Sequence, residues 1–237
     1  MLRLSKTASA PTKHNYLYIA DTAHLPYGNK SPEYLIERGR ALSRFFLSQG
    51  ITTIIVACHT SSATSLAVLQ KEFPEISYID LIPYTVTQAL TCSSNKRIGV
   101  LATQATVQSG IHKRLLQKED PHITVISQAC PLFVTLIESE ASNADIQKAI
   151  ALYMQPLFEA NVDTAILGCT HYEFLRPLIE AYAPSVQFIS AAQATILKSA
   201  QVEEFSIVAT GSFTHSPTFI KNLIGPIQYT LEVEKNI

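Results

Sequence analysis

The sequence predicts an α/β protein in which helices flank mostly parallel sheets. Three observations lead to this class. Short β-branched runs alternate along the chain with longer amphipathic stretches, as in strand–helix–strand units. Several of the short runs are apolar on successive residues, which is typical of strands buried on both faces. The segments 54–62 and 165–171 share one pattern, which indicates two similar halves facing one another.

The expected strands are the runs rich in β-branched and aromatic residues. They lie at residues 16–20, 51–57, 77–81, 98–102, 123–127, 164–168, 186–189 and 206–209. Between them, apolar residues at helical spacing predict helices, and the stripe from Leu35 to Phe46 is assigned to the core. The expected helices cover residues 32–49, 61–73, 85–91, 105–118, 133–140, 144–159, 173–182 and 192–200.

The length of 237 residues suits one large or two small domains, and the repeated pattern favours two pseudo-symmetric ones. We expect the first domain at residues 1–81, completed by residues 192–237, and the second at residues 82–191. Since each half offers a cysteine after a strand, the candidate active site is expected between them.

Composition and charge exclude several classes of partner. Nineteen acidic and 18 basic residues give a net charge of -1, so no nucleic-acid partner is expected. No apolar run approaches the roughly 20 residues of a membrane span, so no membrane partner is expected. The N-terminal residues lack the apolar stretch of a secretory signal, and the four cysteines form no C-x-x-C pair. We therefore expect a cytoplasmic protein without a metal site.

Two cysteines occupy positions where an α/β fold places its chemistry. Ligands of such folds bind beyond the carboxyl ends of the strands. Cys58 and Cys169 each follow a predicted strand, and polar residues that can begin the next helix come directly after them. A helix N-terminus favours a thiolate, and its free N–H groups can hold a carboxylate together with hydroxyls such as Thr60 and Thr170.

Two facing thiols can carry out proton transfer on a small anionic substrate. One thiolate removes a proton from one face, and the other thiol returns a proton to the opposite face. This chemistry needs no metal, flavin or pyridoxal phosphate, so no cofactor is expected. The alternative for either cysteine is a small buried apolar residue at the end of a strand.

Several segments resemble the glutamate racemases of the aspartate/glutamate racemase family, and they occur in the order found in that family. The segments are 21–31, 57–60, 103–110, 129–133 and 167–172. The resemblance extends from about Leu2 to near Gly225. It implies two α/β domains around a cleft and a cofactor-independent interconversion of L- and D-glutamate. It also implies a role in supplying D-glutamate for peptidoglycan, and thus in cell-wall biogenesis and cell shape.

The resemblance also implies a role for each matching residue. Cys58 and Cys169 would be the proton donors and acceptors, His171 would assist Cys169, and Glu138 is a candidate second helper. The implied glutamate contacts are Tyr27, Gly28, His59, Thr60, Thr103, Thr106, Thr170 and His171. The alternatives are a capping or core role for His171, a solvated helix position for Glu138, and turn chemistry for Tyr27 and Gly28. A homodimer is left open.

The chain departs from the family pattern at three places. The family opens with a strand and an Asp-Ser-Gly segment, whose Asp assists the first cysteine, and this chain shows no such segment. Met1–Lys6 matches the helix that follows it, which predicts either a true start upstream of Met1 or a decayed racemase. His59 stands where the family usually has Asn, and Ser190 stands where it has Asp.

These departures keep other functions in consideration. One is a racemase for aspartate or a hydantoin, which a substrate panel distinguishes. Another is a catalytically weak or silent homologue that acts as a glutamate-binding or interaction module. A thiol hydrolase is less favoured, because the sequence shows no orienting acid or oxyanion loop beside Cys169.

Overall fold

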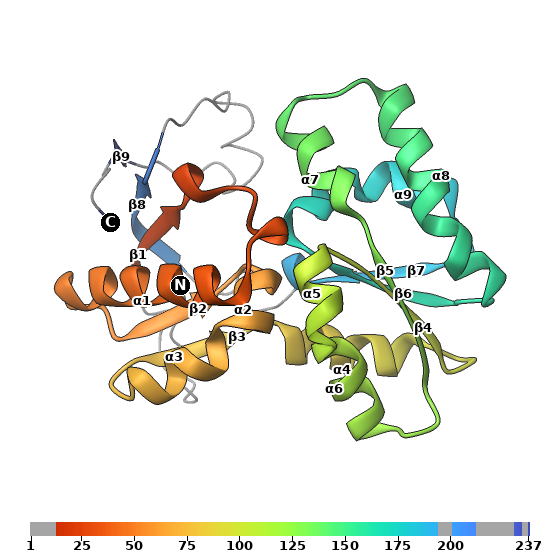
Figure 1. Ribbon diagram of the computed structural model, residues 1–237, viewed down its shortest axis with the longest axis horizontal. Helices are drawn as coiled ribbons and strands as arrows, with labels where there is room; N and C mark the ends of the chain where they lie inside the picture. Colours follow the sequence, from red (N-terminus) through yellow and green to blue (C-terminus); the bar gives the residue numbers. More distant parts are fainter. Residues whose placement is uncertain (1–12, 194–200, 212–229, 234–236) are drawn as a thin grey trace.

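The computed structural model describes residues 13–193, 201–211, 230–233 and 237. Its strands and helices alternate, and all strand pairs in the described part are parallel, so the predicted α/β class is confirmed (Figure 1). The predicted match of Met1–Lys6 to a family helix lies outside the described residues. The predicted helix at 192–200 also lies mostly outside them, since the structure describes only a short 3-10 helix, η4 (Ala191–Gln193), there.

The second half of the molecule contains one continuous four-stranded sheet. Its strand order is β5 (Thr124–Ala129), β4 (Arg97–Ala102), β6 (Thr164–Gly168) and β7 (Gln187–Ser190). Every residue of β6 is buried, as expected for a central strand covered on both faces. Successive residues point to opposite faces, so Leu167 packs with one hydrophobic cluster and Ile166 with the other.

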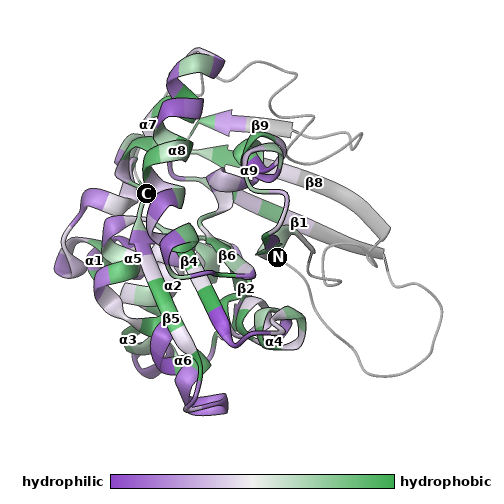
Figure 2. Ribbon diagram, turned by 90° about the vertical axis from the view of Figure 1, so that its right-hand side faces the viewer, coloured by the Kyte–Doolittle hydropathy of each residue, from purple (hydrophilic) through white to green (hydrophobic). Residues whose placement is uncertain are grey.

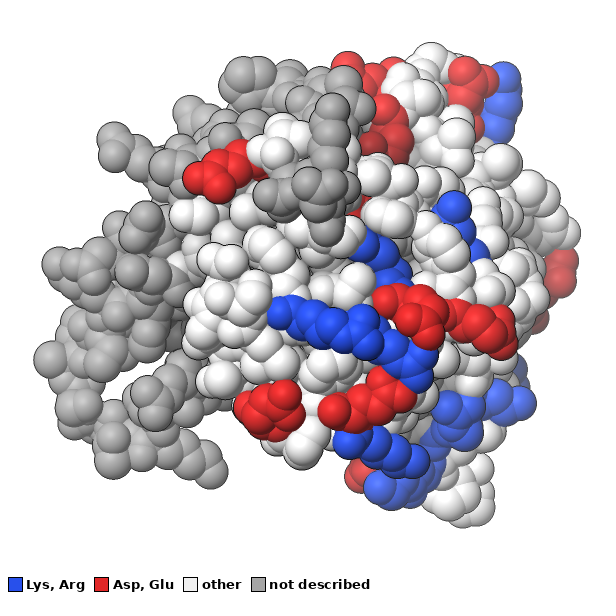
Figure 3. Space-filling model, turned by 60° about the vertical axis from the view of Figure 1, so that its left-hand side comes forward, with Lys and Arg blue, Asp and Glu red and all other residues white. Residues whose placement is uncertain are grey.

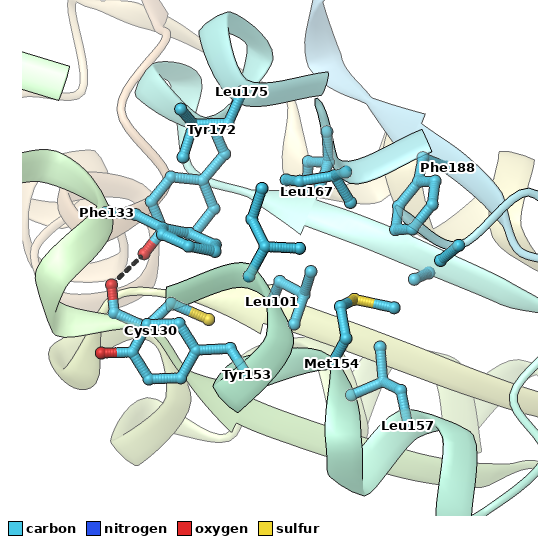
Figure 4. Packing of buried hydrophobic residues seen from close by; sticks show 14 of the residues in the cluster. Leu101, Cys130, Phe133, Tyr153, Met154, Leu157, Leu167, Tyr172, Leu175 and Phe188 are labelled. Atoms are coloured by element: carbon cyan, nitrogen blue, oxygen red, sulfur yellow. Dashed lines mark hydrogen bonds between the residues drawn. The ribbon is translucent and has the colours of Figure 1, made fainter. Parts of the chain in front are cut away.

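Helices cover both faces of this sheet (Figure 1). One layer contains α7 (Pro131–Glu138), α8 (Asn143–Glu159) and α9 (Arg176–Tyr182), and the other contains α4 (Ile82–Cys92), α5 (Gln104–Ser109) and α6 (Ile111–Glu119). In the first layer, Phe133 packs edge-on against Tyr153 and Tyr172, and the Tyr172 hydroxyl donates a 2.9 Å hydrogen bond to the Cys130 carbonyl (Figure 4). This contact fixes the segment that follows Cys169 against α7.

Within the described residues, the strands of the first half form two separate sheets. β1 (Lys13–Ala20) pairs with β8 (Gln201–Ala209), which pairs with β9 (Thr230–Val233). β2 (Thr53–Val56) pairs with β3 (Ser77–Asp80) in a separate two-stranded sheet. Since β8 returns from the C-terminal region to pair with β1, the first sheet combines strands from the N-terminal and C-terminal parts of the chain. The domain boundaries at residues 81 and 192 remain a prediction.

Three helices and two short 3-10 turns accompany these strands. They are η1 (Thr22–His24), η2 (Tyr27–Asn29), α1 (Pro32–Ser48), α2 (His59–Thr64) and α3 (Leu66–Glu72). α1 begins with a standard cap, because the Ser31 hydroxyl accepts a hydrogen bond from the Tyr34 amide and Pro32 occupies the first turn.

Two predicted helices are each broken in the structure. The helix expected at 61–73 is divided at Ser65, where the hydroxyls of Thr64 and Ser65 bond back to carbonyls four residues earlier, a pattern that bends helices. The helix expected at 105–118 is divided at Gly110, whose φ of 66° is left-handed. The segment expected at 173–182 begins earlier, as the 3-10 helix η3 (Thr170–Leu175), and β9 was not predicted.

The described surface is mixed in polarity and charge. Hydrophilic and hydrophobic residues alternate along the helices, and none of the described helices combines the length and apolarity needed to cross a membrane (Figure 2). On the face shown in Figure 3, basic and acidic residues lie side by side. Arg40 of α1, for example, pairs with Glu37 and Glu72.

Candidate active site

One cavity of about 500 Å³ lies where the two halves meet, and both Cys58 and Cys169 line it. In the second half, the chain leaves β4 toward β5 on one side and leaves β6 toward β7 on the other. The carboxyl ends of β4 and β6 are therefore a topological switch point, which is where open α/β sheets bind ligands. Thr103 follows β4 and Cys169 follows β6, so the sheet topology delivers both residues to the cavity.

Cys58 lies directly before the first turn of α2, as the sequence predicted. Burial raises the pKa of its thiol, and the nearby charge of Cys169 raises it further. Hydrogen bonds from Ser61 and from the Thr60 backbone act in the opposite direction but are outweighed. The site therefore favours the protonated thiol at Cys58, which is the form that donates a proton.

Cys169 lies directly before η3 and has a histidine and a carboxylate behind it. Its Sγ atom is 4.0 Å from Nδ1 of His171, and Nε2 of His171 is 2.7 Å from Oε1 of Glu138. Burial alone would lower the pKa of His171, but its hydrogen bonds with Cys169 and Glu138 raise it to about 10. His171 is therefore a cation at neutral pH, and it lies beside the sulfur of Cys169.

Three threonine hydroxyls form a buried triangle at the junction of the halves. Thr60 of α2 lies 2.8 Å from Thr103 and 3.3 Å from Thr106, and the last two are 3.0 Å apart. Thr103 also caps α5. Thr60 and Thr103 line the cavity, as does the exposed Thr170, whereas Thr106 is not among its lining residues and supports the other two hydroxyls from behind.

The turn containing Tyr27 and Gly28 closes over Thr103. A Cβ atom on Gly28 would lie 2.7 Å from Cβ of Thr103, so only glycine allows this approach. The Tyr27 hydroxyl donates to Asp21, which also accepts two 2.6 Å bonds from Arg38 and a 2.7 Å bond from Thr210. Burial would raise the pKa of Asp21, but these donors lower it, so Asp21 is an anion that holds the turn in place.

The structure places His59 away from the cavity. Its side chain is 2% exposed, is not among the lining residues, and stacks on His112 of α6 with ring centroids 5.7 Å apart and planes at 15°. Burial lowers the pKa of His59 to about 4 and that of His112 to about 3. Both rings are therefore neutral at neutral pH. The predicted contact of His59 with the substrate remains a prediction that this orientation does not favour.

Among the lining residues that the sequence did not single out, Tyr18 and Asp21 carry groups that can interact with a polar substrate. Tyr18 of β1 lies near both Cys58 and Glu138, and burial together with their charges raises the pKa of its hydroxyl. Asp21 directly follows β1, and its position after a strand end is the signal that would have identified it. Tyr18 lies inside a strand, where a tyrosine has no local feature that distinguishes a lining role from a core role.

The fold thus brings two thiols from different halves of the chain to one cavity. Residues 1–199 match the Asp/Glu/Hydantoin racemase family, and the chain belongs to this family. It is similar to the glutamate racemase of Desulforudis audaxviator, with 41% identity over 182 residues. That match covers 76% of this chain and 66% of the relative, so the matched region spans just under two thirds of the relative's length.

Solved structures show the same architecture. A glutamate racemase isoform from Bacillus anthracis superimposes with a TM-score of 0.83 at 26% identity, covering 93% of this chain and 88% of that one. The glutamate racemase of Francisella tularensis, solved in complex with D-glutamate, gives a TM-score of 0.81 at 26% identity with the same coverage. The expected two-domain α/β architecture is therefore confirmed.

Proposed function

We propose that this chain is a glutamate racemase that interconverts L- and D-glutamate by proton transfer between Cys58 and Cys169. One observation carries the proposal: the two thiols line a single cavity from different halves of the molecule, each directly before a helical turn. Stereoinversion at a carbon requires groups on opposite faces of that carbon. The names of the relatives, and the D-glutamate in the Francisella tularensis complex, favour glutamate as the substrate.

The surroundings of the two sulfurs suit opposite roles in the resting site. Cys169 beside the cationic His171 takes the role of base, and Glu138 holds His171 in its protonated form. Cys58, whose thiol form is favoured by burial, takes the role of acid on the other face. After one turnover the roles are reversed, and the reverse reaction begins from that state.

The hydroxyls and amides around the cavity suit an anionic substrate. Thr60, Thr103 and Thr170 line the cavity, and the helical turns after Cys58 and Cys169 begin beside it. These groups can bind the carboxylates of glutamate. The D-glutamate formed would supply peptidoglycan synthesis in the cytoplasm.

The direct test is circular dichroism of L- and D-glutamate incubated with the purified chain, with aspartate and hydantoins as competing substrates. We expect both enantiomers of glutamate to converge on the racemic mixture. Turnover of aspartate or a hydantoin with glutamate unchanged would assign the chain to another activity of the same family.

A second candidate is a glutamate-binding module with little or no turnover. The divided first sheet favours it, because Cys58 follows β2, which has a strand partner on only one edge within the described residues. In this case glutamate would bind and protect the chain against unfolding, while its Cα proton would not exchange in D₂O.

A further inference from the structure

The helix α7 carries Glu138 at one end and is anchored most firmly at the other. Of its eight residues, Phe133 and Val134 are buried, and both lie in the first turn. The side chain of Glu138, the last residue of the helix, is 26% exposed. The carboxylate that bonds His171 is therefore at the end of α7 that the core holds least.

Aromatic side chains from two other elements hold the beginning of α7 (Figure 4). Phe133 lies edge-on to Tyr153 of α8 and to Tyr172 of η3, with ring centroids 5.1 and 5.0 Å apart. The Tyr172 hydroxyl donates a 2.9 Å hydrogen bond to the Cys130 carbonyl, and burial raises the pKa of this hydroxyl, so it keeps its proton. The Leu132 amide donates to the Tyr153 hydroxyl at 3.3 Å. Edge-on ring contacts and hydrogen bonds are directional, so they fix the orientation of the helix as well as its position.

The turn η3 contacts α7 at two points. Tyr172 bonds the residue that precedes the helix, and the neighbouring His171 bonds Glu138 at the far end, with Nε2 2.7 Å from Oε1. The Tyr172 amide also donates to the Cys169 carbonyl at 3.1 Å, which holds the cysteine to the same turn. An eight-residue helix is about 12 Å long, so two contacts at its ends define its direction. Loss of either contact leaves α7 able to turn about the other.

We propose that Tyr172 is a positioning residue that acts through α7: its hydrogen bond to Cys130 sets the direction of the helix and keeps the Glu138 carboxylate on His171. Tyr172 is not among the residues that line the cavity, so it touches neither a substrate nor the reacting atoms. The inference rests on the proposed function, because it explains how the groups behind Cys169 are held.

The pKa of His171 reports on this positioning. The groups whose hydrogen bonds and charges raise it to about 10 are Cys169 and Glu138. When the Glu138 carboxylate moves away, one of these two contributions is lost. A change in the direction of α7 therefore lowers the pKa of His171.

The test is the titration of His171 by NMR in the full chain labelled with ¹⁵N-histidine, without substrate. Its signal is the one missing from His171→Asn. Tyr172→Phe keeps the ring against Phe133 and removes only the hydroxyl, and we expect the pKa of His171 to fall from about 10 by about one unit or more. Tyr182→Phe makes the same change at a position 44% exposed on α9 and should leave the pKa unchanged. An unchanged pKa of His171 in folded Tyr172→Phe would overturn the proposal.

A double-mutant cycle distinguishes positioning from a general loss of packing. Tyr172→Phe should lower kcat/KM for glutamate about tenfold. When Glu138→Gln is already present, the same substitution should lower it less than about twofold, because its effect passes through the carboxylate that is gone. Effects that multiply in the double variant would mean that Tyr172 acts independently of Glu138, and the proposal would be wrong.

A second variant loosens the same anchor without removing a polar group. Phe133→Leu loses the edge-on contacts with both tyrosines and should also lower the pKa of His171. Far-ultraviolet circular dichroism checks the fold of each variant, and Phe133→Leu decides the outcome if Tyr172→Phe does not fold. The titration needs no turnover, so a chain that fails to racemise glutamate would refute the proposed function and leave this test intact.

Discussion

The two halves of this molecule present their cysteines in different ways. Cys169 follows the central strand of a continuous sheet and has His171 and Glu138 aligned behind it. Cys58 follows β2, an edge of a divided sheet, and its hydrogen bonds come from Ser61 and the Thr60 backbone. The pattern strand–cysteine–helix is thus shared, but the groups that surround each sulfur are not. The local motif determines where a thiol lies, and the packing around it determines what the thiol does.

The largest expected effect comes from removing either thiol. Cys58→Ala and Cys169→Ala should each lower kcat for glutamate by at least about 10³-fold, within the range for loss of a proton-transfer group. Neither cysteine can replace the other, because they lie on opposite faces of the substrate in the proposed mechanism. Cys92→Ala is the matched control, since Cys92 does not line the cavity. Most of the turnover persisting in either cavity variant would refute the two-thiol mechanism.

A smaller effect is expected from the groups behind Cys169. Glu138→Gln removes the negative charge that helps to hold the pKa of His171 at about 10. We expect kcat to fall about tenfold to hundredfold, and most strongly in the direction in which Cys169 accepts the proton. The equilibrium constant between enantiomers stays at unity, so KM must change in compensation.

The pH profile gives the readout that a purely structural role of Glu138 would not change. The alkaline limb of kcat should move to lower pH in Glu138→Gln, because His171 loses its proton more readily. Glu140→Gln, at an exposed position two residues further along, serves as the control. An unshifted alkaline limb in Glu138→Gln would show that His171 does not set the state of Cys169.

The buried pair His59 and His112 and the active-site residue His171 should make the stability of the chain depend on pH in opposite directions. The pKa values of His59 and His112, about 4 and 3, lie below the ordinary value of 6.5, so the unfolded chain binds more protons in acid. The contribution of the two neutral rings to the free energy of unfolding is complete above pH 6.5. It decreases as the pH falls toward 4, by on the order of 3 kcal/mol for each ring. The contribution of His171 is complete below pH 6.5 and is lost as the pH rises through about 10.

Urea denaturation between pH 4 and 7 measures this difference. His112→Phe keeps a ring stacked on His59 but cannot take up a proton, so the loss of unfolding free energy in acid should be about half that of the parent chain. An unchanged acid dependence would contradict the buried, neutral state assigned to the pair.

The sequence predicted eight of the nine described strands, the α/β class and the position of both cysteines after strand ends. These features depend on local periodicity and on the residue types directly after a strand end. The sequence did not predict that the His59 side chain lies away from the cavity, because the stacking of its ring on His112 depends on how α6 packs near α2. The helix breaks at Ser65 and Gly110 were not predicted either, because the apolar pattern continues across both positions. At Ser65 the hydroxyl bonds to the carbonyl four residues earlier, and at Gly110 the backbone is left-handed. The sequence also did not predict that Tyr18 lines the cavity, because this depends on how β1, paired with β8, lies relative to Cys58.

No change is expected on removal of metal ions. Proton transfer between two thiols requires only side chains of the chain itself, so turnover in excess EDTA should equal that in untreated buffer. A loss of activity that added Zn²⁺ or Mg²⁺ restores would show that the proposed mechanism lacks an essential component.

The two-thiol mechanism requires that two different groups act on opposite faces of the same carbon, and deuterium incorporation distinguishes this from exchange by a single base. The chain is incubated with L-glutamate in D₂O, and both enantiomers are analysed early in the reaction by chiral separation and mass spectrometry. We expect deuterium at Cα of the D-glutamate formed and almost none in the recovered L-glutamate, because the acid that delivers the proton is not the base that removed it. Deuterium appearing at comparable rates in the recovered L-glutamate would mean that a single group serves both faces, and the two-thiol mechanism would then be wrong.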